Sequence, residues 1–163
     1  MMKKLSVFML VLCCFSILAA CSTDPVKKDL ITYVNDGMLP LAQDEKTVTE
    51  KYGSVTGDNF TDDETLYNTL RDEIIPQYTK YLDKVEAVKT ETPEVRAVHE
   101  TYVKAVSTQK EAFITMLDAL EKGDLNLINE SNTKLSEGRK LFRDFGEQVN
   151  TLAKEHDVTL NKK

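Results

Sequence analysis

The chain has 163 residues, of which 29% are charged and 41% are hydrophobic, and its formal net charge is −6. This length allows one domain, and this composition excludes a disordered or low-complexity protein. The negative charge also argues against a nucleic-acid partner, because nucleic-acid-binding proteins carry a basic footprint.

The first twenty residues have the organisation of a secretory signal peptide. Lys3 and Lys4 give it a positively charged start, and the apolar run Leu5–Leu18 follows. That run is shorter than the ~20 apolar residues that a membrane-spanning helix needs. The sequence therefore predicts export and cleavage. An uncleaved anchor helix is the alternative.

The predicted signal peptide ends in Leu18-Ala19-Ala20-Cys21, which resembles the lipobox of bacterial lipoproteins. The resemblance implies that Cys21 receives a thioether-linked diacylglycerol with palmitate-type chains, and that cleavage makes it the lipidated N-terminus. Cys13 and Cys14 leave with the signal peptide, so the mature chain has no pair of cysteines for a disulfide. An ordinary secretory signal followed by a chance cysteine is the alternative.

These assignments divide the chain into a signal peptide at 1–20, a lipidated N-terminus with a short tether at 21–25, and a helical domain at 26–163. The chain resembles small helical-bundle lipoproteins of Gram-positive, Bacillus-like bacteria, many of which have no assigned function. The resemblance implies a protein anchored by lipid to the extracytoplasmic face of the cell membrane, with membrane lipid as its partner through Cys21. Two acyl chains suffice for stable anchoring.

Four helical patterns of similar length fill the rest of the chain. Their apolar residues recur mostly three, four or seven positions apart, over 26–54, 62–89, 93–122 and 125–156. Each pattern is about 45 Å long at ~1.5 Å per residue. Long matched helices with short connections predict an all-α, up-down-up-down four-helix bundle. The alternative is a three-helix bundle in which the first helix breaks at 37–40 and packs separately.

Capping signals mark the helix ends. Helix starts are predicted at Asp24-Pro25, Thr92-Pro93 and Asp124. A helix end is predicted at Gly123. Thr61-Asp62-Asp63-Glu64 predicts a capping box before the second helix, with Phe60 as its hydrophobic staple.

Two prolines fall inside the first two helical patterns. Pro40 and Pro76 each remove a backbone hydrogen bond and crowd the carbonyl four residues back, which predicts a kink in both helices. If the two helices fold back around Asp58, the kinks lie side by side. Paired kinks either open a pocket in the bundle or only bend the helices around the core.

Four side chains are candidates for contact with a ligand or partner: Gln43, Gln109, Tyr78 and Tyr102. Gln109 lies on the apolar seam of its helix, where a buried amide needs hydrogen-bond partners. A tyrosine-rich interior can hold a hydrophobic or aromatic ligand, and the same residues can instead be core positions whose hydroxyls reach the rim.

An acidic cluster before and within the start of the second helix is a candidate cation site. Its members are Asp58, Asp62, Asp63 and Glu64, although their spacing does not fit the EF-hand loop. Acidic residues are also favoured at helix N-termini by the helix dipole, so capping is the alternative.

The sequence predicts a protein that is not an enzyme. It contains no metalloprotease, dithiol, nucleophile-elbow or phosphate-loop motif, and we expect no cofactor. His99 and His156 are isolated on different helices and are expected at the surface or rim.

We expect a non-enzymatic binding or interaction module of the cell envelope, with a protein or cell-wall component as its partner. The alternative is a carrier or sensor with a pocket for a small ligand or cation within the bundle.

Overall fold

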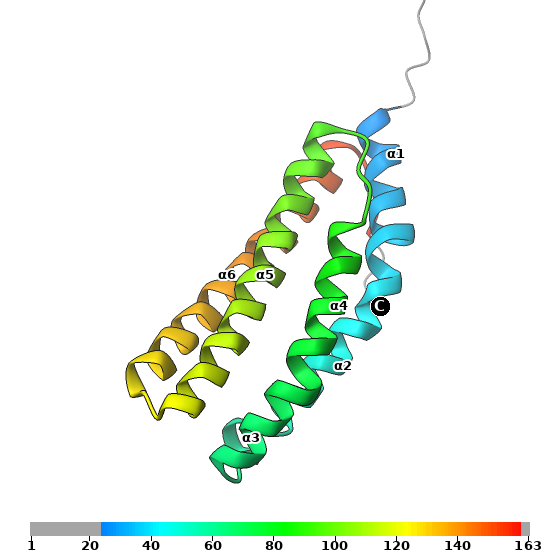
Figure 1. Ribbon diagram of the computed structural model, residues 1–163. Helices are drawn as coiled ribbons and strands as arrows, with labels where there is room; N and C mark the ends of the chain where they lie inside the picture. Colours follow the sequence, from blue (N-terminus) through cyan, green and yellow to red (C-terminus); the bar gives the residue numbers. More distant parts are fainter. Residues whose placement is uncertain (1–23, 161–163) are drawn as a thin grey trace, which may run out of the picture.

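The structure of the protein is a computed structural model that describes residues 24–160, so the predicted signal peptide and Cys21 lie outside the described residues. The described chain contains no strand and folds up-down-up-down, which confirms the all-α helical bundle (Figure 1). Its elements are, in order, α1 (Pro25–Thr32), the π-helix η1 (Tyr33–Met38), the 3-10 helix η2 (Leu39–Leu41), α2 (Ala42–Gly53), the 3-10 helix η3 (Gly57–Asn59), α3 (Asp63–Thr69), the π-helix η4 (Leu70–Ile74), α4 (Ile75–Glu86), α5 (Pro93–Lys122) and α6 (Leu125–Glu155).

Each mid-helix proline lies just after a π-helical segment. The Leu39 N–H donates to the carbonyl of Val34, and the Ile75 N–H donates to the carbonyl of Leu70, five residues back in both cases. The wider π turn accommodates a proline that cannot donate and that crowds the carbonyl four residues back. We call α1, η1, η2 and α2 together the first rod, and α3, η4 and α4 the second rod. Both rods are distorted at the predicted places, but each remains continuous. The predicted alternative, a broken first helix, does not occur.

A glycine lets the first π-helix approach the end of α4. A Cβ atom added at Gly37 would come 2.8 Å from Cγ1 of Val88, closer than side chains pack. The close contact helps to hold η1 on the bundle despite its irregular hydrogen bonding.

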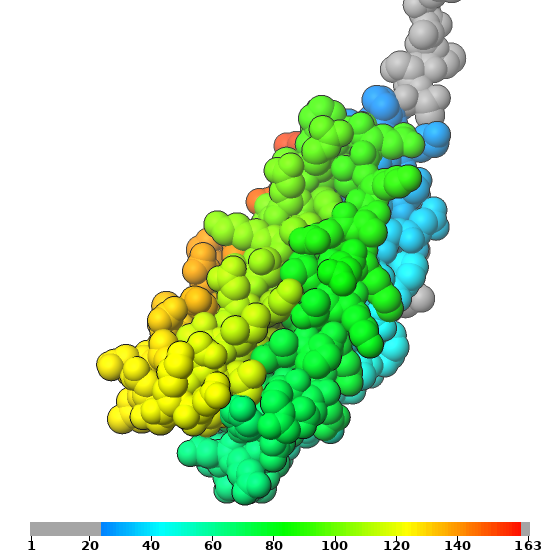
Figure 2. Space-filling model, in the orientation of Figure 1, coloured from blue at the N-terminus to red at the C-terminus, as the bar shows by residue number. Residues whose placement is uncertain are grey.

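Two apolar clusters run along the bundle. The larger lies between α2, α3, α4 and the α5–α6 hairpin and includes the fully buried Phe113. The smaller joins α1 to the start of α5 and the end of α6 and includes Leu30 and Val95, while Met38 and Phe145 pack against both clusters. Figure 2 shows that side chains fill the space that the ribbon leaves open between α4 and α5.

A buried carboxylate ties α1 to the connection between α4 and α5. Asp29 is only 4% exposed, and its Oδ2 accepts hydrogen bonds from the Glu91 N–H at 3.0 Å, the Thr92 N–H at 2.7 Å and the Thr92 hydroxyl at 2.7 Å. Thr92 precedes α5 but makes no side-chain capping bond of its own. Asp29 thus supplies the negative charge that the N-terminus of α5 favours, from a different helix.

The capping signals are confirmed with one shift. Capping hydrogen bonds or a left-handed φ confirm three boundaries, Asp24, Asp124 and Gly123. The predicted capping box is wrong by one residue, because Asp62 rather than Thr61 is the N-cap and accepts from the Thr65 N–H at 2.7 Å. Phe60 is 47% exposed and is therefore not a buried staple. An aspartate caps as well as a threonine and adds a favourable charge to the helix dipole.

The last described residues form a short tail, residues 156–160, that turns back along α1. Asp157 has a φ of 51°, and the Val158 N–H donates to the carbonyl of Ala153 at 2.8 Å. The His156 ring contacts Asp24 Oδ2 at 2.7 Å, so the tail begins beside the start of α1.

Replacing Asp29 with alanine should lower the free energy of unfolding by about 2–4 kcal/mol, because it leaves two amide N–H groups and a hydroxyl without their acceptor. Urea unfolding of residues 22–163, followed by circular dichroism, measures the change. Asp83→Ala, at an exposed position of α4, is the control and should change it by less than about 0.5 kcal/mol. Equal effects of the two variants would contradict the assignment.

Candidate functional site

A buried chain of hydroxyl groups ends on one carboxylate. The Tyr102 hydroxyl of α5 donates to Oε2 of Glu45 at 3.0 Å and also contacts the hydroxyl of Tyr81 on α4. Because the only hydroxyl proton of Tyr102 goes to the carboxylate, Tyr81 is the donor in the second bond. Both tyrosines are buried, at 1% and 6% exposed for Tyr81 and Tyr102.

The local structure explains the position of the carboxylate. Glu45 lies in the first turn of α2, directly after the proline-containing η2, where the helix dipole favours negative charge. Tyr102 packs against Phe145 of α6 with ring centroids 4.6 Å apart, which fixes the direction of its hydroxyl. The site therefore takes one polar group from each of three rods.

The protein environment opposes ionisation of this site. Burial raises the pKa of Glu45, and the hydrogen bond from Tyr102 offsets only part of that effect. Burial and the neighbouring carboxylate raise the pKa of Tyr102 as well. The tyrosine hydroxyl therefore stays protonated and remains a donor at neutral pH.

Glu45 has no cationic partner within the described residues. No lysine, arginine or histidine nitrogen of residues 24–160 lies within 4.0 Å of its carboxylate. The adjacent Asp44, in contrast, pairs with Lys84 of α4 at 2.6 Å. A half-buried carboxylate whose only side-chain hydrogen bond comes from one tyrosine can still accept a charged donor.

The carboxylate opens onto a pocket of about 350 Å³ between the first rod and α6, which we call the Glu45 pocket. Its lining is mostly apolar: Val34, Met38, Leu39, Ala42, Glu45, Tyr102, Phe145, Gly146, Val149 and Asn150. Small-molecule sites combine an apolar wall with a few placed polar groups, and this pocket has that character.

Of the four predicted ligand residues, Tyr102 lies in the pocket and Tyr78 lies nearby in the core. Tyr78 is 1% exposed, stacks edge-on with Phe113, and its hydroxyl has no hydrogen-bond partner in the described chain. Gln109 packs against Gly138 of α6, with its Cβ 3.6 Å from the position of a Cβ added at that glycine. Gln43 is exposed and bonds only to Thr47 of its own helix, so it does not join the pocket.

The acidic cluster is exposed and caps a helix. Asp62 accepts from both the Thr65 N–H and the Thr65 hydroxyl, and these bonds lower its pKa. Asp58, Asp63 and Glu64 are exposed. Within residues 24–160 no group of three histidine, cysteine or acidic residues is placed to hold a metal ion.

The two histidines have structural contacts. The prediction that His99 lies at the surface is wrong: it is 8% exposed, stacks edge-on with Tyr33 and lies 3.3 Å from its hydroxyl. Burial lowers the pKa of His99. His156 is half-buried against Asp24 and lowers the pKa of that carboxyl group.

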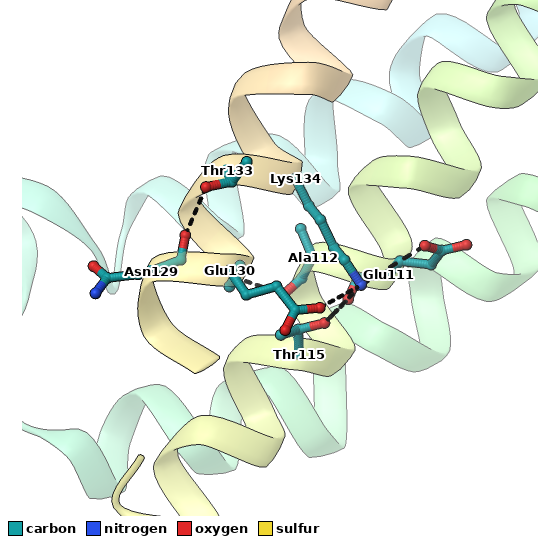
Figure 3. A network of polar contacts seen from close by, with 8 residues as sticks. Glu111, Ala112, Thr115, Asn129, Glu130, Thr133 and Lys134 are labelled. Carbon is teal, nitrogen blue, oxygen red and sulfur yellow. Dashed lines mark hydrogen bonds and ion pairs between the residues drawn. The ribbon is translucent and has the colours of Figure 1, made fainter. Parts of the chain in front are cut away.

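A second polar network fixes α5 to α6 away from the pocket (Figure 3). The buried Ser131 hydroxyl donates to the Ala112 carbonyl at 2.8 Å. Lys134 of α6 reaches Glu130 at 3.2 Å and the Thr115 hydroxyl at 3.3 Å. These contacts hold the α5–α6 hairpin together.

A family model described as "EMYY-motif containing lipoprotein" matches residues 2–163. The letters Glu-Met-Tyr-Tyr do not occur consecutively in this chain, so the description does not point to a site here. No curated protein and no solved structure matches the chain. None of the described helices is long and apolar enough to cross a membrane.

Replacing Glu45 with glutamine should stabilise the fold at pH 7 and have little effect at pH 4. A carboxyl group with a raised pKa contributes most to stability when protonated, and that contribution is lost as the pH rises through its folded-state pKa. Glutamine mimics the protonated form and avoids the loss. Urea unfolding at both pH values measures the difference.

Glu50→Gln provides the control, because Glu50 is an exposed glutamate of the same helix. It should change stability little, and by the same amount, at the two pH values. A Glu45→Gln variant that is no more stable than the parent at pH 7 would show that the carboxylate is well solvated.

Proposed function

Because the chain belongs to the EMYY-motif containing lipoproteins, a membrane-anchored family, we propose that it is a non-enzymatic binding module on the extracytoplasmic face of the cell membrane. Its ligand is a small molecule with an apolar body and a cationic group, held in the Glu45 pocket. This proposal takes the predicted small-ligand alternative in preference to a cation site in the acidic cluster.

One observation carries the proposal: a half-buried carboxylate with no ion-pair partner among residues 24–160 lines an apolar pocket. The Glu45 carboxylate supplies a charge-assisted hydrogen bond and attracts an ammonium group. The rings of Tyr102 and Phe145 line the same pocket and favour a cation through their faces. The burial that raises the pKa of Glu45 also strengthens its attraction for an organic cation.

The absence of enzymatic activity stays a prediction, and the histidine contacts support it. His99 faces Tyr33 in the core, and His156 faces Asp24 at the end of the bundle. Among the described residues, neither ring is bonded to a serine, threonine or cysteine side chain.

A second candidate partner is an envelope protein or cell-wall component. It would bind the end of the bundle that lies far from the start of α1. Large apolar side chains are exposed there, near the α5–α6 turn and before α3: Phe60, Ile114 and Leu125. Leu125, at the start of α6, is the most exposed of these three side chains, at 74%. In Figure 1 this end lies opposite the start of α1, and therefore away from the lipid predicted at Cys21.

Replacing Cys21 with alanine should abolish lipid attachment and leave either an uncleaved precursor or a released protein. Intact mass spectrometry of the membrane and soluble fractions reports both outcomes. A conservative substitution in the mature tether, Ser22→Ala, serves as the control and should leave the protein in the membrane fraction. Normal processing and normal fractionation of Cys21→Ala would refute the lipid anchor.

Hexylamine should bind the protein more tightly than hexanol or hexanoate, since the three probes differ only in their polar group. Isothermal titration calorimetry at pH 7 measures the three affinities. Glu45→Gln should weaken hexylamine binding by about tenfold, the effect of losing one charge-assisted contact. Glu50→Gln should not change it. Equal binding of the amine and the alcohol would contradict the proposal.

A further inference from the structure

We propose that one acyl chain of the lipid on Cys21 lies in an apolar groove formed by α1, η1 and the C-terminal tail. This inference rests on lipidation of Cys21 and not on the ligand of the Glu45 pocket. It assigns an occupant to a second hollow, which adjoins the Glu45 pocket and shares Val34, Leu39 and Val149 with it.

The groove, here the tail groove, has a volume of about 610 Å³. Its lining is largely apolar or uncharged: Lys27, Ile31, Val34, Asn35, Leu39, Val149, Asp157, Val158, Thr159 and Leu160. Ile31 and Leu39 are 41% and 49% exposed, although both are large aliphatic side chains that burial would stabilise. A hydrocarbon chain in the groove would cover these two side chains.

The wall of the groove is held in place by specific contacts. The Lys27 ammonium donates to the Asp157 carbonyl at 2.8 Å, and the His156 ring contacts Asp24. The left-handed φ of Asp157 then directs the tail along the first rod, where Val158 and Leu160 pack against the smaller apolar cluster. The walls of the groove are therefore held in place by the fold. The Lys27 ammonium is hydrogen-bonded to the Asp157 carbonyl.

The position of the groove matches the position of the lipid. Cys21 is four residues before Pro25, a separation of at most about 14 Å along an extended chain. The groove begins at Lys27, about 3 Å further along α1 at the usual helical rise. The lipid attachment point thus lies within reach of the Lys27 end of the groove, where tethering gives a high effective concentration.

The length of the groove also fits one acyl chain. From Lys27 to Leu39 the first rod extends about 18 Å. An acyl chain in a membrane spans one leaflet of the hydrocarbon core, or about 15 Å. A single acyl chain therefore matches the tail groove in length.

Docking of one chain changes how the protein is held at the membrane. A single acyl chain left in the bilayer gives only marginal, reversible membrane binding, whereas two give stable anchoring. A variant with a blocked groove should therefore leave vesicles more slowly than the parent.

Photo-cross-linking tests the proposal on the full lipidated protein. The protein is produced in cells that incorporate a diazirine-bearing fatty acid, is checked by intact mass, and is irradiated in phosphatidylcholine–phosphatidylglycerol vesicles. We expect acyl adducts on peptides that contain Ile31 to Leu39 and Val158 to Leu160. Ile31→Glu should reduce these adducts by at least about fivefold, because it places a charge against the hydrocarbon chain.

Thr32→Glu is the matched control, because it adds the same charge at the neighbouring exposed residue that does not line the groove. It should leave the adducts unchanged. Leu160→Glu gives a second test, on a lining residue that is not part of the Glu45 pocket, if Ile31→Glu fails to fold, as judged by circular dichroism.

The source of the chain is settled by mixing the photoactive protein with a ¹⁵N-labelled copy that carries ordinary lipid. If adducts form only on unlabelled peptides, the acyl chain in the groove belongs to the same protein molecule, as proposed. Adducts on labelled peptides would assign the groove to the lipid of a second molecule and overturn the proposal. Adducts confined to phospholipid would place both chains in the bilayer and overturn it as well.

Discussion

The two prolines inside the first two rods set the constraint from which the rest of the arrangement follows. A proline cannot donate a backbone hydrogen bond, and both rods respond with a π-helical turn just before it. In the first rod this irregular segment, η1 with η2, carries Val34, Met38 and Leu39 on the wall of the Glu45 pocket. It also carries Val34 and Leu39 on the tail groove. The Glu45 pocket and the tail groove thus both adjoin the segment of the first rod whose helical hydrogen bonding is irregular.

Two buried or half-buried carboxylates of the first rod have opposite roles. Asp29 accepts three hydrogen bonds from Glu91 and Thr92, just before α5, so its hydrogen-bond partners are all within the protein. Glu45 receives one, from Tyr102, and its ionisation is opposed by burial. A group that costs stability at neutral pH without a partner is typical of a functional position, because natural proteins keep such groups where activity needs them.

The sequence predicted the fold well because its signals are local. Apolar spacing gave four rods with nearly correct ends, and Asp24, Asp124 and Gly123 are caps in the structure as predicted. The shift from Thr61 to Asp62 shows the limit of this reasoning, since two good N-cap residues stand side by side and only tertiary packing decides between them.

The candidate site was only partly predictable, since it depends on contacts between distant residues. Tyr102 was a candidate from its place on an apolar seam, but Glu45 was missed, because a glutamate in the first turn of a helix normally faces water. Gln43 was also predicted to contact a ligand or partner, but it lies on the exposed side of α2. Asp29 and the buried His99 were missed for a related reason. Each is a polar residue whose partner lies more than 60 positions away in the chain.

The contact between Asp24 and His156 determines how mechanical load enters the molecule. A pull on the lipid anchor reaches the folded domain at Asp24, whose carboxylate holds both the first turn of α1 and the ring at the end of α6. The load is therefore shared between the first and last helices, which run in opposite directions and resist it as one clamped pair. A tether at the Cys21 that the sequence predicts to be lipidated would pull on the first and last helices together, through Asp24 and His156.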